Sequence, residues 1–102
     1  PSSAHLSRAM AAALPPGDGL VVELGGGTGP ITQALLDTGL DADRLAVIER
    51  DPHFCRYLEQ RFGAAWLICG DAFHLQTLVR DLACTVPVRA VVSGLPLSVR
   101  SS

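Results

Sequence analysis

Acidic residues and glycines follow apolar runs at regular places along this chain of 102 residues. Glu23 precedes a cluster of four glycines at 25–29, while Glu49 and Asp71 close two later apolar runs. A carboxylate has two acceptor oxygens, which suit a pair of ribose hydroxyls or an amino group of adenine. Glycines let a ligand lie against the backbone without a Cβ in the way. Together these residues predict a binding site for a cofactor that contains a nucleoside.

The spacing of the glycines indicates which cofactor is bound. A dinucleotide-binding loop has glycines at the first, third and sixth positions, but Pro30 occupies the sixth position counted from Gly25. The pattern is instead Glu-x-Gly-x-Gly-x-Gly, which resembles the first motif of class I S-adenosylmethionine-dependent methyltransferases. Those enzymes place the methionine part of the cofactor over this loop. Taken alone, such a loop is explained about equally well as a structural turn.

Apolar periodicity predicts the elements that position this loop. We expect helices over 3–14, 30–38 and 51–62, a further helix carrying Leu75, Leu78, Val79 and Leu82, and strands over 20–24, 45–49, 66–69 and 88–92. Pro30 suits the first position of a helix. Alternating strands and helices predict an α/β fold, a Rossmann-like parallel sheet of about four strands with flanking helices. Ligands of such sheets bind at the carboxyl ends of the strands.

The same patterns predict which side chains are buried. The expected inward faces of the first three helices are Leu6, Met10, Ala13 and Leu14, then Ile31, Ala34 and Leu35, and then Phe54, Leu58 and Phe62. Two further aromatic residues, Tyr57 and Trp66, are expected to be core or half-buried. Cys55, Cys69 and Cys84 are widely spaced and form no metal-type pair, so we expect reduced, buried thiols in a cytoplasmic protein. We expect no metal site.

Each acidic residue has a functional and a structural interpretation. Glu49 follows Gly25 by 24 residues and is placed to bind both ribose hydroxyls, or else it forms an ion pair with Arg50 or Arg44. Asp71 is placed to accept from the adenine amino group, or it caps the next helix. Glu23 lies within a strand and needs a partner; it orients the loop or faces the positively charged end of the cofactor.

The stretch from Ser93 to Leu97 is the expected meeting place of substrate and methyl group. Methyl transfer requires an unprotonated amine aligned with the sulfonium methyl, and rigid backbone carbonyls provide such alignment. The alternative is an ordinary loop after a strand. His74 is the histidine that we considered as a base. The expected catalytic residues are Ser93, Gly94, Leu95 and Pro96, and the expected cofactor-binding residues are Glu23, Gly25, Gly26, Gly27, Thr28, Gly29, Glu49, Arg50, Asp71, Ala72, Phe73 and Ser93.

Four segments together resemble the phospholipid N-methyltransferases, which are close kin of the ribosomal RNA adenine dimethylases: residues 23–35, 48–54, 70–73 and 91–97. The resemblance implies S-adenosylmethionine as cofactor and methylation of an amine, such as that of phosphatidylethanolamine. The RNA enzymes have Asn-Leu-Pro followed by an aromatic residue at the acceptor loop. Here Gly94 and Leu97 take the Asn and aromatic positions, so both partners of a flipped adenine are missing.

The bulk properties support a lipid rather than an RNA substrate. The net charge is −2 with no basic run, and no apolar run reaches the length of a membrane span. We therefore expect a cytoplasmic enzyme with peripheral contact at the inner membrane face. The alternatives are a ribosomal RNA adenine N6-dimethyltransferase and a non-catalytic nucleotide-binding or assembly module. The oligomeric state stays open.

The resemblance also predicts the extent of the domain. Residues 1–102 are expected to form a single, truncated S-adenosylmethionine-binding domain, because the class I fold has seven strands and four are recognised here. The segment would then bind the cofactor at most. The fourth strand would lack its neighbour and leave an apolar edge.

Overall fold

The computed structural model describes residues 3–70, 74, 77, 80–81, 86–94 and 97–101. Its elements follow in the order α1 (Ser3–Ala13), β1 (Leu20–Leu24), α2 (Pro30–Asp37), the short 3₁₀ helix η1 (Ala42–Arg44), β2 (Leu45–Glu49), α3 (Pro52–Arg61), β3 (Trp66–Cys69), β4 (Val88–Gly94) and β5 (Leu97–Ser101). The first four strands and the first three helices lie close to where the sequence predicts them, whereas β5 was not predicted. The expected helix around Leu75–Leu82 falls largely outside the described residues.

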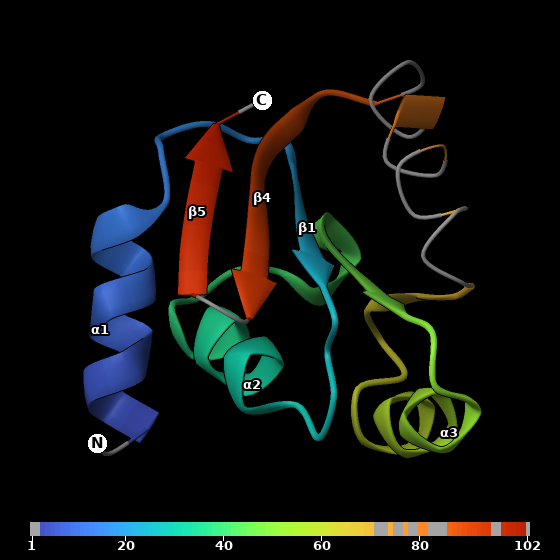
Figure 1. Cartoon of the computed structure of the whole chain (residues 1–102). Coiled ribbons are helices and arrows are strands. Elements are labelled where there is room, and N and C mark those ends of the chain that lie inside the picture. The colour runs from blue at the N-terminus through green and yellow to red at the C-terminus, as the bar shows by residue number, and fades with distance from the viewer. Residues whose placement is uncertain are drawn as a thin grey trace.

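The strands form one sheet in the order β3-β2-β1-β4-β5. The first four run parallel, which confirms the predicted fold class, and β5 runs antiparallel to β4 (Figure 1). The expectation that β4 has no further neighbour is wrong, because β5 pairs with it from Gly94↔Leu97 to Ala90↔Ser101. Residues 97–101 alternate between apolar and polar types, which is a strand pattern. The predicted acceptor loop overlaps this strand at Leu97.

One face of the sheet carries all three described α-helices. Their buried residues form one core with inward side chains of β1, β2 and β4, and the members are Met10, Val21, Ala34, Leu35, Leu45, Val47, Leu58, Phe62 and Val92. Leu6, Leu14 and Ile31 pack against this core as predicted, but Ala13 is exposed. A smaller cluster of Val22, Ala46 and Ile48 lies on the other face, and no described helix contributes to it.

Aromatic residues of α3 and β3 are more exposed than predicted. Phe54, Tyr57 and Trp66 have exposed fractions of 38%, 44% and 61%. In α3 the helix phase places Cys55, rather than Phe54, on the inward stripe with Leu58 and Phe62. The residues at 55, 58 and 62 fit helical spacing as well as those at 54, 58 and 62 do, so periodicity alone could not separate them. The Trp66 indole donates from Nε1 to the Asp43 carbonyl oxygen at 2.8 Å, which explains its outward position.

Two further features bear on function. Among the described residues, no helix has the length and apolar character required to cross a membrane. Within the same ranges, no cluster of three or more histidine, cysteine or acidic side chains could hold a metal ion.

Candidate cofactor and acceptor site

The glycine loop joins the end of β1 to the start of α2 and has two kinds of glycine. Gly25 and Gly27 have positive φ angles of 75° and 57°, and a Cβ at either would meet nothing within 4 Å. Gly26 and Gly29 instead face the protein, where a Cβ would lie 2.6 Å from Val47 and 2.5 Å from Phe62, respectively. The loop is therefore packed tightly on its inner side and open on its outer side, where a ligand can lie against the backbone.

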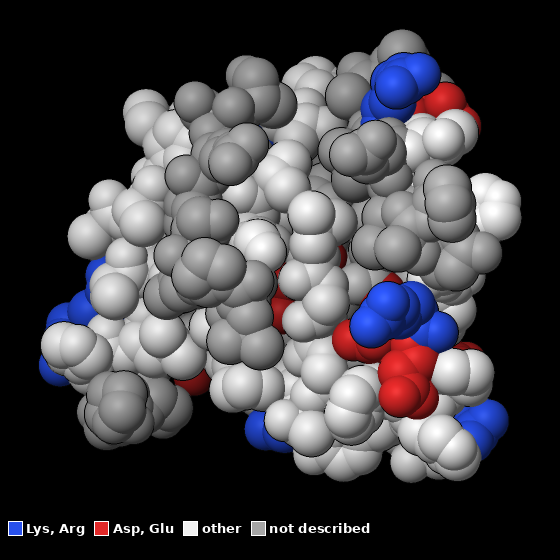
Figure 2. Space-filling model, viewed as in Figure 1, with Lys and Arg blue, Asp and Glu red and all other residues white. Residues whose placement is uncertain are grey.

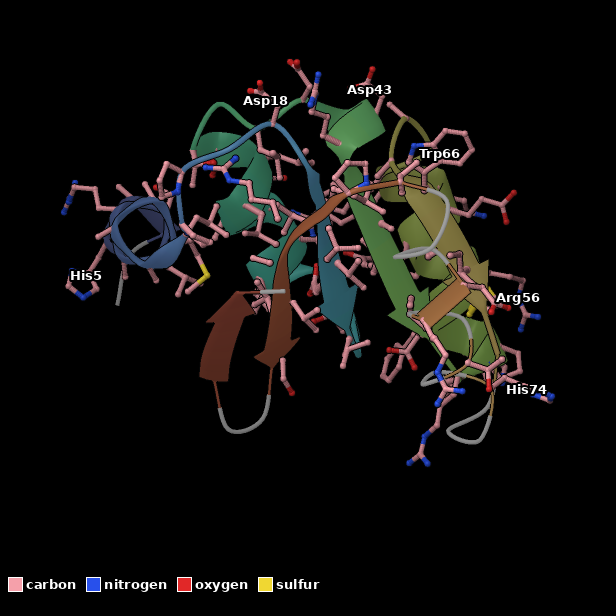
Figure 3. The ribbon with its side chains drawn as sticks, turned by 90° about the horizontal axis from the view of Figure 1, so that it is seen from above. His5, Asp18, Asp43, Arg56, Trp66 and His74 are labelled. Atoms are coloured by element: carbon pink, nitrogen blue, oxygen red, sulfur yellow. A yellow bond between two sulfur atoms is a disulfide. The ribbon has the colours of Figure 1, made fainter. Side chains whose placement is uncertain are left out.

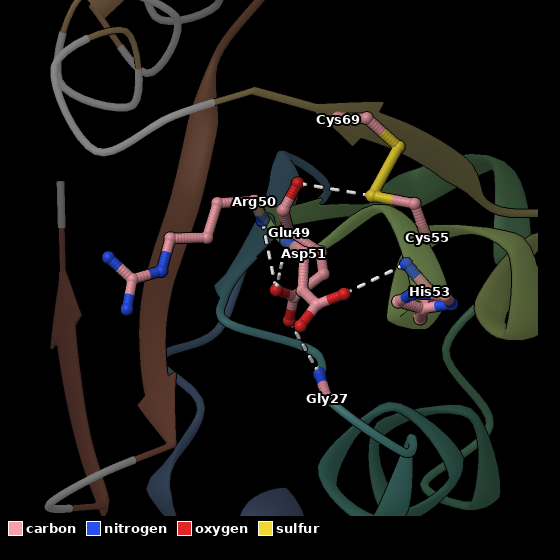
Figure 4. The surroundings of a disulfide bond; sticks show 7 residues. All are labelled: Gly27, Glu49, Arg50, Asp51, His53, Cys55 and Cys69. Atoms are coloured by element: carbon pink, nitrogen blue, oxygen red, sulfur yellow. Dashed lines mark hydrogen bonds between the residues drawn. A yellow bond between two sulfur atoms is a disulfide. The ribbon is translucent and has the colours of Figure 1, made fainter.

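Glu49 lies at the end of β2 and its carboxylate contacts the glycine loop. Only 6% of the residue is exposed. Its Oε1 accepts from the Gly27 N–H at 2.8 Å, and its Oε2 accepts from the N–H groups of Arg50 and Asp51, both at 2.9 Å (Figure 4). These three partners are backbone groups rather than the arginine side chains of the ion-pair alternative. The carboxylate is thus held beside the open side of the loop.

Glu23 is fully buried beneath the loop. Its Oε1 accepts from the Thr32 hydroxyl of α2 at 2.6 Å, while its Oε2 has no hydrogen-bond partner. Burial raises the pKa of Glu23 to about 7, with a further rise from the charge of Glu49 and an opposing effect of the Thr32 bond. The sequence indicates that Glu23 needs a partner but does not identify it as Thr32, which lies in the first turn of α2 and is buried.

Strand pairing brings the predicted strand ends to one edge. Leu24 is level with Ile48 on one side and with Ser93 on the other, and Glu49 is level with Cys69. Backbone bonds from the Gly25 N–H to the Ile48 oxygen (2.8 Å) and from the Gly70 N–H to the Glu49 oxygen (3.1 Å) continue this alignment beyond the strands. The glycine loop, Glu49 and Ser93 therefore share the carboxyl edge of the sheet.

Other predicted site residues have less defined places. Asp71, Ala72, Phe73, Leu95 and Pro96 lie outside the described residues, and Gly94 is described as the last residue of β4. Thr28 and Arg50 are exposed, and the Thr28 carbonyl accepts from Arg61 Nη1 at 3.4 Å. His74 is exposed, and its role as a base stays a prediction.

The expectation of reduced thiols is wrong for Cys55 and Cys69, while the expected burial is confirmed for Cys55 and wrong for Cys69. A disulfide joins Cys55 of α3 to Cys69 of β3, and Cys69 is exposed (Figure 4). The two residues are 14 positions apart, and only the packing of α3 beside β3 brings their Cα atoms to 6.2 Å. Spacing in the sequence could not show this contact. Cys84 lies outside the described residues.

A cavity of about 760 Å³ lies elsewhere, where the strands begin. Its lining includes Leu20, Ala46, Trp66, Asp18 and Asp43. Figure 3 shows the labelled members Asp18, Asp43 and Trp66 along one margin of the molecule. Because Leu20 and Trp66 are the first residues of their strands, the cavity is at the amino edge of the sheet, away from the glycine loop. Its position, rather than its size, excludes it as the cofactor site.

Known proteins share both the sequence and the fold of this chain, although no family model matches it. An ornithine lipid N-methyltransferase of Singulisphaera acidiphila is 40% identical over 107 residues, which cover 95% of this chain and 52% of that protein. A probable ribosomal RNA small subunit methyltransferase A of Natronomonas pharaonis is 41% identical over 87 residues, or 79% of this chain and 28% of the relative. These relatives are methyltransferases, and the chain resembles them in sequence and has the class I methyltransferase fold.

Solved methyltransferase structures support this placement at the level of the fold. The glycopeptide N-methyltransferase MtfA in complex with S-adenosyl-L-homocysteine matches 74% of this chain and 35% of its own, with a TM-score of 0.58 and 24% identity. The same protein in complex with S-adenosyl-L-methionine matches 68% of this chain and 32% of its own, with a TM-score of 0.55 and 23% identity. The chain spans about half the length of the lipid relative and about a quarter of the ribosomal RNA relative.

Proposed function

We propose that this chain forms the S-adenosylmethionine-binding part of an enzyme that methylates the amine of a lipid headgroup. The observation that carries the cofactor assignment is the contact between Glu49 and Gly27, with 2.8 Å between Oε1 and N. It joins a carboxylate suited to a ribose diol to a loop whose outer side is open to a ligand.

The chemistry of the buried groups fits the cofactor. Glu23 keeps one carboxylate oxygen without a partner beneath the loop, and a buried acceptor without a donor is costly. The positively charged end of S-adenosylmethionine would supply a donor on this side. Glu49 would exchange its bonds to backbone N–H groups for the ribose hydroxyls. Bound there, the cofactor supplies an electrophilic methyl group, and the chain's own residues bind it and align the acceptor.

The acceptor assignment depends on the carboxyl end of β4. Ser93 lies at the same edge as the glycine loop, so an amine held after β4 would approach a methyl group over that loop. Gly94 and Leu97 offer neither a side-chain amide nor an aromatic ring for an adenine base. On the face drawn in Figure 2, the arginine side chains are spread singly, and one lies over acidic side chains. A broad basic patch for RNA is not seen among the residues described on that face.

The lipid relative supports this choice, since its match covers 95% of this chain whereas that of the ribosomal RNA relative covers 79%. That relative is an ornithine lipid N-methyltransferase, so its name gives a lipid as the acceptor and nitrogen as the methylated atom. We therefore infer a cytoplasmic site of action, with the acceptor reached at a membrane surface. A ribosomal RNA adenine is the second candidate acceptor because the second relative is 41% identical.

Calorimetry tests the cofactor assignment. We expect S-adenosylmethionine to bind and NAD not to bind, because the glycine spacing does not fit a dinucleotide. Glu49→Ala should weaken binding about tenfold to a hundredfold, the effect of losing one or two charged hydrogen bonds. Arg50→Ala is the matched control and should change binding about twofold or less, because Arg50 provides a backbone N–H that alanine retains. Binding of NAD alone, or equal small effects of both substitutions, would contradict the proposal.

A further inference from the structure

The disulfide between Cys55 and Cys69 lies beside Glu49, the residue that we assign to the ribose. Cys69 is the strand partner of Glu49 at the end of β3. Cys55 lies in the first turn of α3, and its N–H donates to the carbonyl oxygen of Asp51, 2.9 Å away. Its Sγ lies 3.2 Å from the Glu49 carbonyl oxygen (Figure 4). The cross-link therefore joins α3 to β3, the two elements that contact the backbone of Glu49 on this side.

We propose that Cys55 and Cys69 form a reversible thiol–disulfide site that controls the affinity of the carboxyl edge for its cofactor. This inference rests on the proposed function. In the disulfide form, α3 and β3 are joined covalently beside the Glu49 carbonyl group. In the reduced form, the Cys55 thiol donates to the Glu49 carbonyl oxygen, which also accepts from the Gly70 N–H. The backbone around Glu49 is then held by hydrogen bonds alone.

The two cysteines differ in access, which sets the order of the reaction. Cys69 is exposed, whereas Cys55 is 5% exposed. With glutathione disulfide as oxidant, the Cys69 thiolate attacks one sulfur and releases one glutathione thiolate. The Cys55 thiolate then attacks the Cys69 sulfur of the mixed disulfide and releases the second glutathione. The two thiols lose two protons and two electrons in total. Glutathione disulfide takes up the two protons and the two electrons and becomes two glutathione molecules.

The disulfide form is expected to bind the cofactor more tightly. Glu49 must present its carboxylate to the ribose, and the segment after β3 begins at Gly70, next to the cross-link. A covalent bond between α3 and β3 leaves less backbone freedom to lose on binding, which is the usual gain from preorganisation. We expect reduction to weaken S-adenosylmethionine binding by about threefold to tenfold.

The experiment equilibrates the purified chain with defined ratios of glutathione and glutathione disulfide. Alkylation followed by peptide mass mapping should find Cys55 joined to Cys69 in the oxidised sample and three modified cysteines in the reduced sample. Calorimetry with S-adenosylmethionine then compares the two states. Cys69→Ser, which changes an exposed residue, should bind like the reduced chain under both conditions. Cys84→Ser is the matched control and should keep the redox dependence of the unmodified chain.

Failure of this inference can be told apart from failure of the proposed function. Equal affinity in the two redox states, or a disulfide that involves Cys84, would overturn the inference while the cofactor assignment stands. Loss of the redox dependence in Cys84→Ser would also overturn it. Absence of S-adenosylmethionine binding in both redox states would overturn the inference and the proposed function together.

Discussion

Glu23 makes the stability of the fold depend on pH. Burial raises its pKa from 4.5 to about 7, so the folded chain holds a proton at pH 6 that the unfolded chain has released. The free energy of unfolding should then fall as pH rises from about 5 to 8. A shift of this size corresponds to a loss of about 3 kcal/mol once Glu23 is ionised in the folded state. Ionisation of the buried Glu23 carboxylate therefore lowers the free energy of unfolding near neutral pH.

Glu23→Gln should remove this part of the pH dependence. Glutamine stays neutral, and its side-chain oxygen can still accept from the Thr32 hydroxyl. Urea unfolding at pH 5 and pH 8 should show a smaller fall for the variant than for the unmodified chain, with the variant more stable at pH 8. The two proteins differ only at position 23, so the difference between the two slopes isolates Glu23. Equal slopes would show that Glu23 titrates near its ordinary pKa.

At the scale of elements, the glycine loop packs closely against α3 and the residue that follows it, Phe62. Gly29 and Gly39 have nearly the same φ, 95° and 96°, but a Cβ at Gly29 would lie 2.5 Å from the Phe62 ring while a Cβ at Gly39 would meet nothing. Gly39→Ala should therefore lose only the left-handed backbone preference, about 1 kcal/mol. Gly29→Ala should lose a further 1–3 kcal/mol, roughly, through overpacking. Urea unfolding of the two variants measures the difference.

Gly29→Ala should also weaken S-adenosylmethionine binding, because relief of the clash with Phe62 moves the loop away from Glu49. Gly39→Ala should leave binding unchanged, since Gly39 follows α2 at its far end. Equal losses of stability in the two variants would mean that the loop is not fixed by α3, and its contact with Phe62 would then have no part in shaping the site.

The elements that sequence predicts well are those whose signals are local. β1, β2, β3 and β4 are short apolar runs that end at glycine or acidic residues, and parallel pairing then brings their ends together without further information. Features that depend on contacts between elements were missed. The bond from Thr32 to Glu23, the pairing of Cys55 with Cys69 and the inward position of Cys55 all require the actual packing of helices on the sheet.

At the scale of the whole molecule, charge and the end of β4 favour the lipid among the two candidate acceptors that we propose. RNA binding draws much of its free energy from neutralised phosphates, but this chain has a net charge of −2. Gly94 and Leu97 also lack the groups that would hold a flipped adenine. A lipid amine needs neither a basic surface nor a stacking ring. Aligned backbone groups and an unprotonated nitrogen suffice.

Labelled S-adenosylmethionine should therefore transfer its methyl group to an aminolipid and not to RNA. Because the chain spans about half the length of the lipid relative, the assay uses the longest product of its gene. That product is offered vesicles with primary-amine headgroups and, separately, an RNA hairpin with unpaired adenines. We expect at least about tenfold faster labelling of the lipid, a difference of about 1.4 kcal/mol in transition-state stabilisation. Glu49→Ala should slow labelling of either acceptor at low S-adenosylmethionine concentration if both depend on this cofactor site. Faster labelling of RNA, falling steeply with added salt, would instead assign the chain to the adenine-methylating relatives.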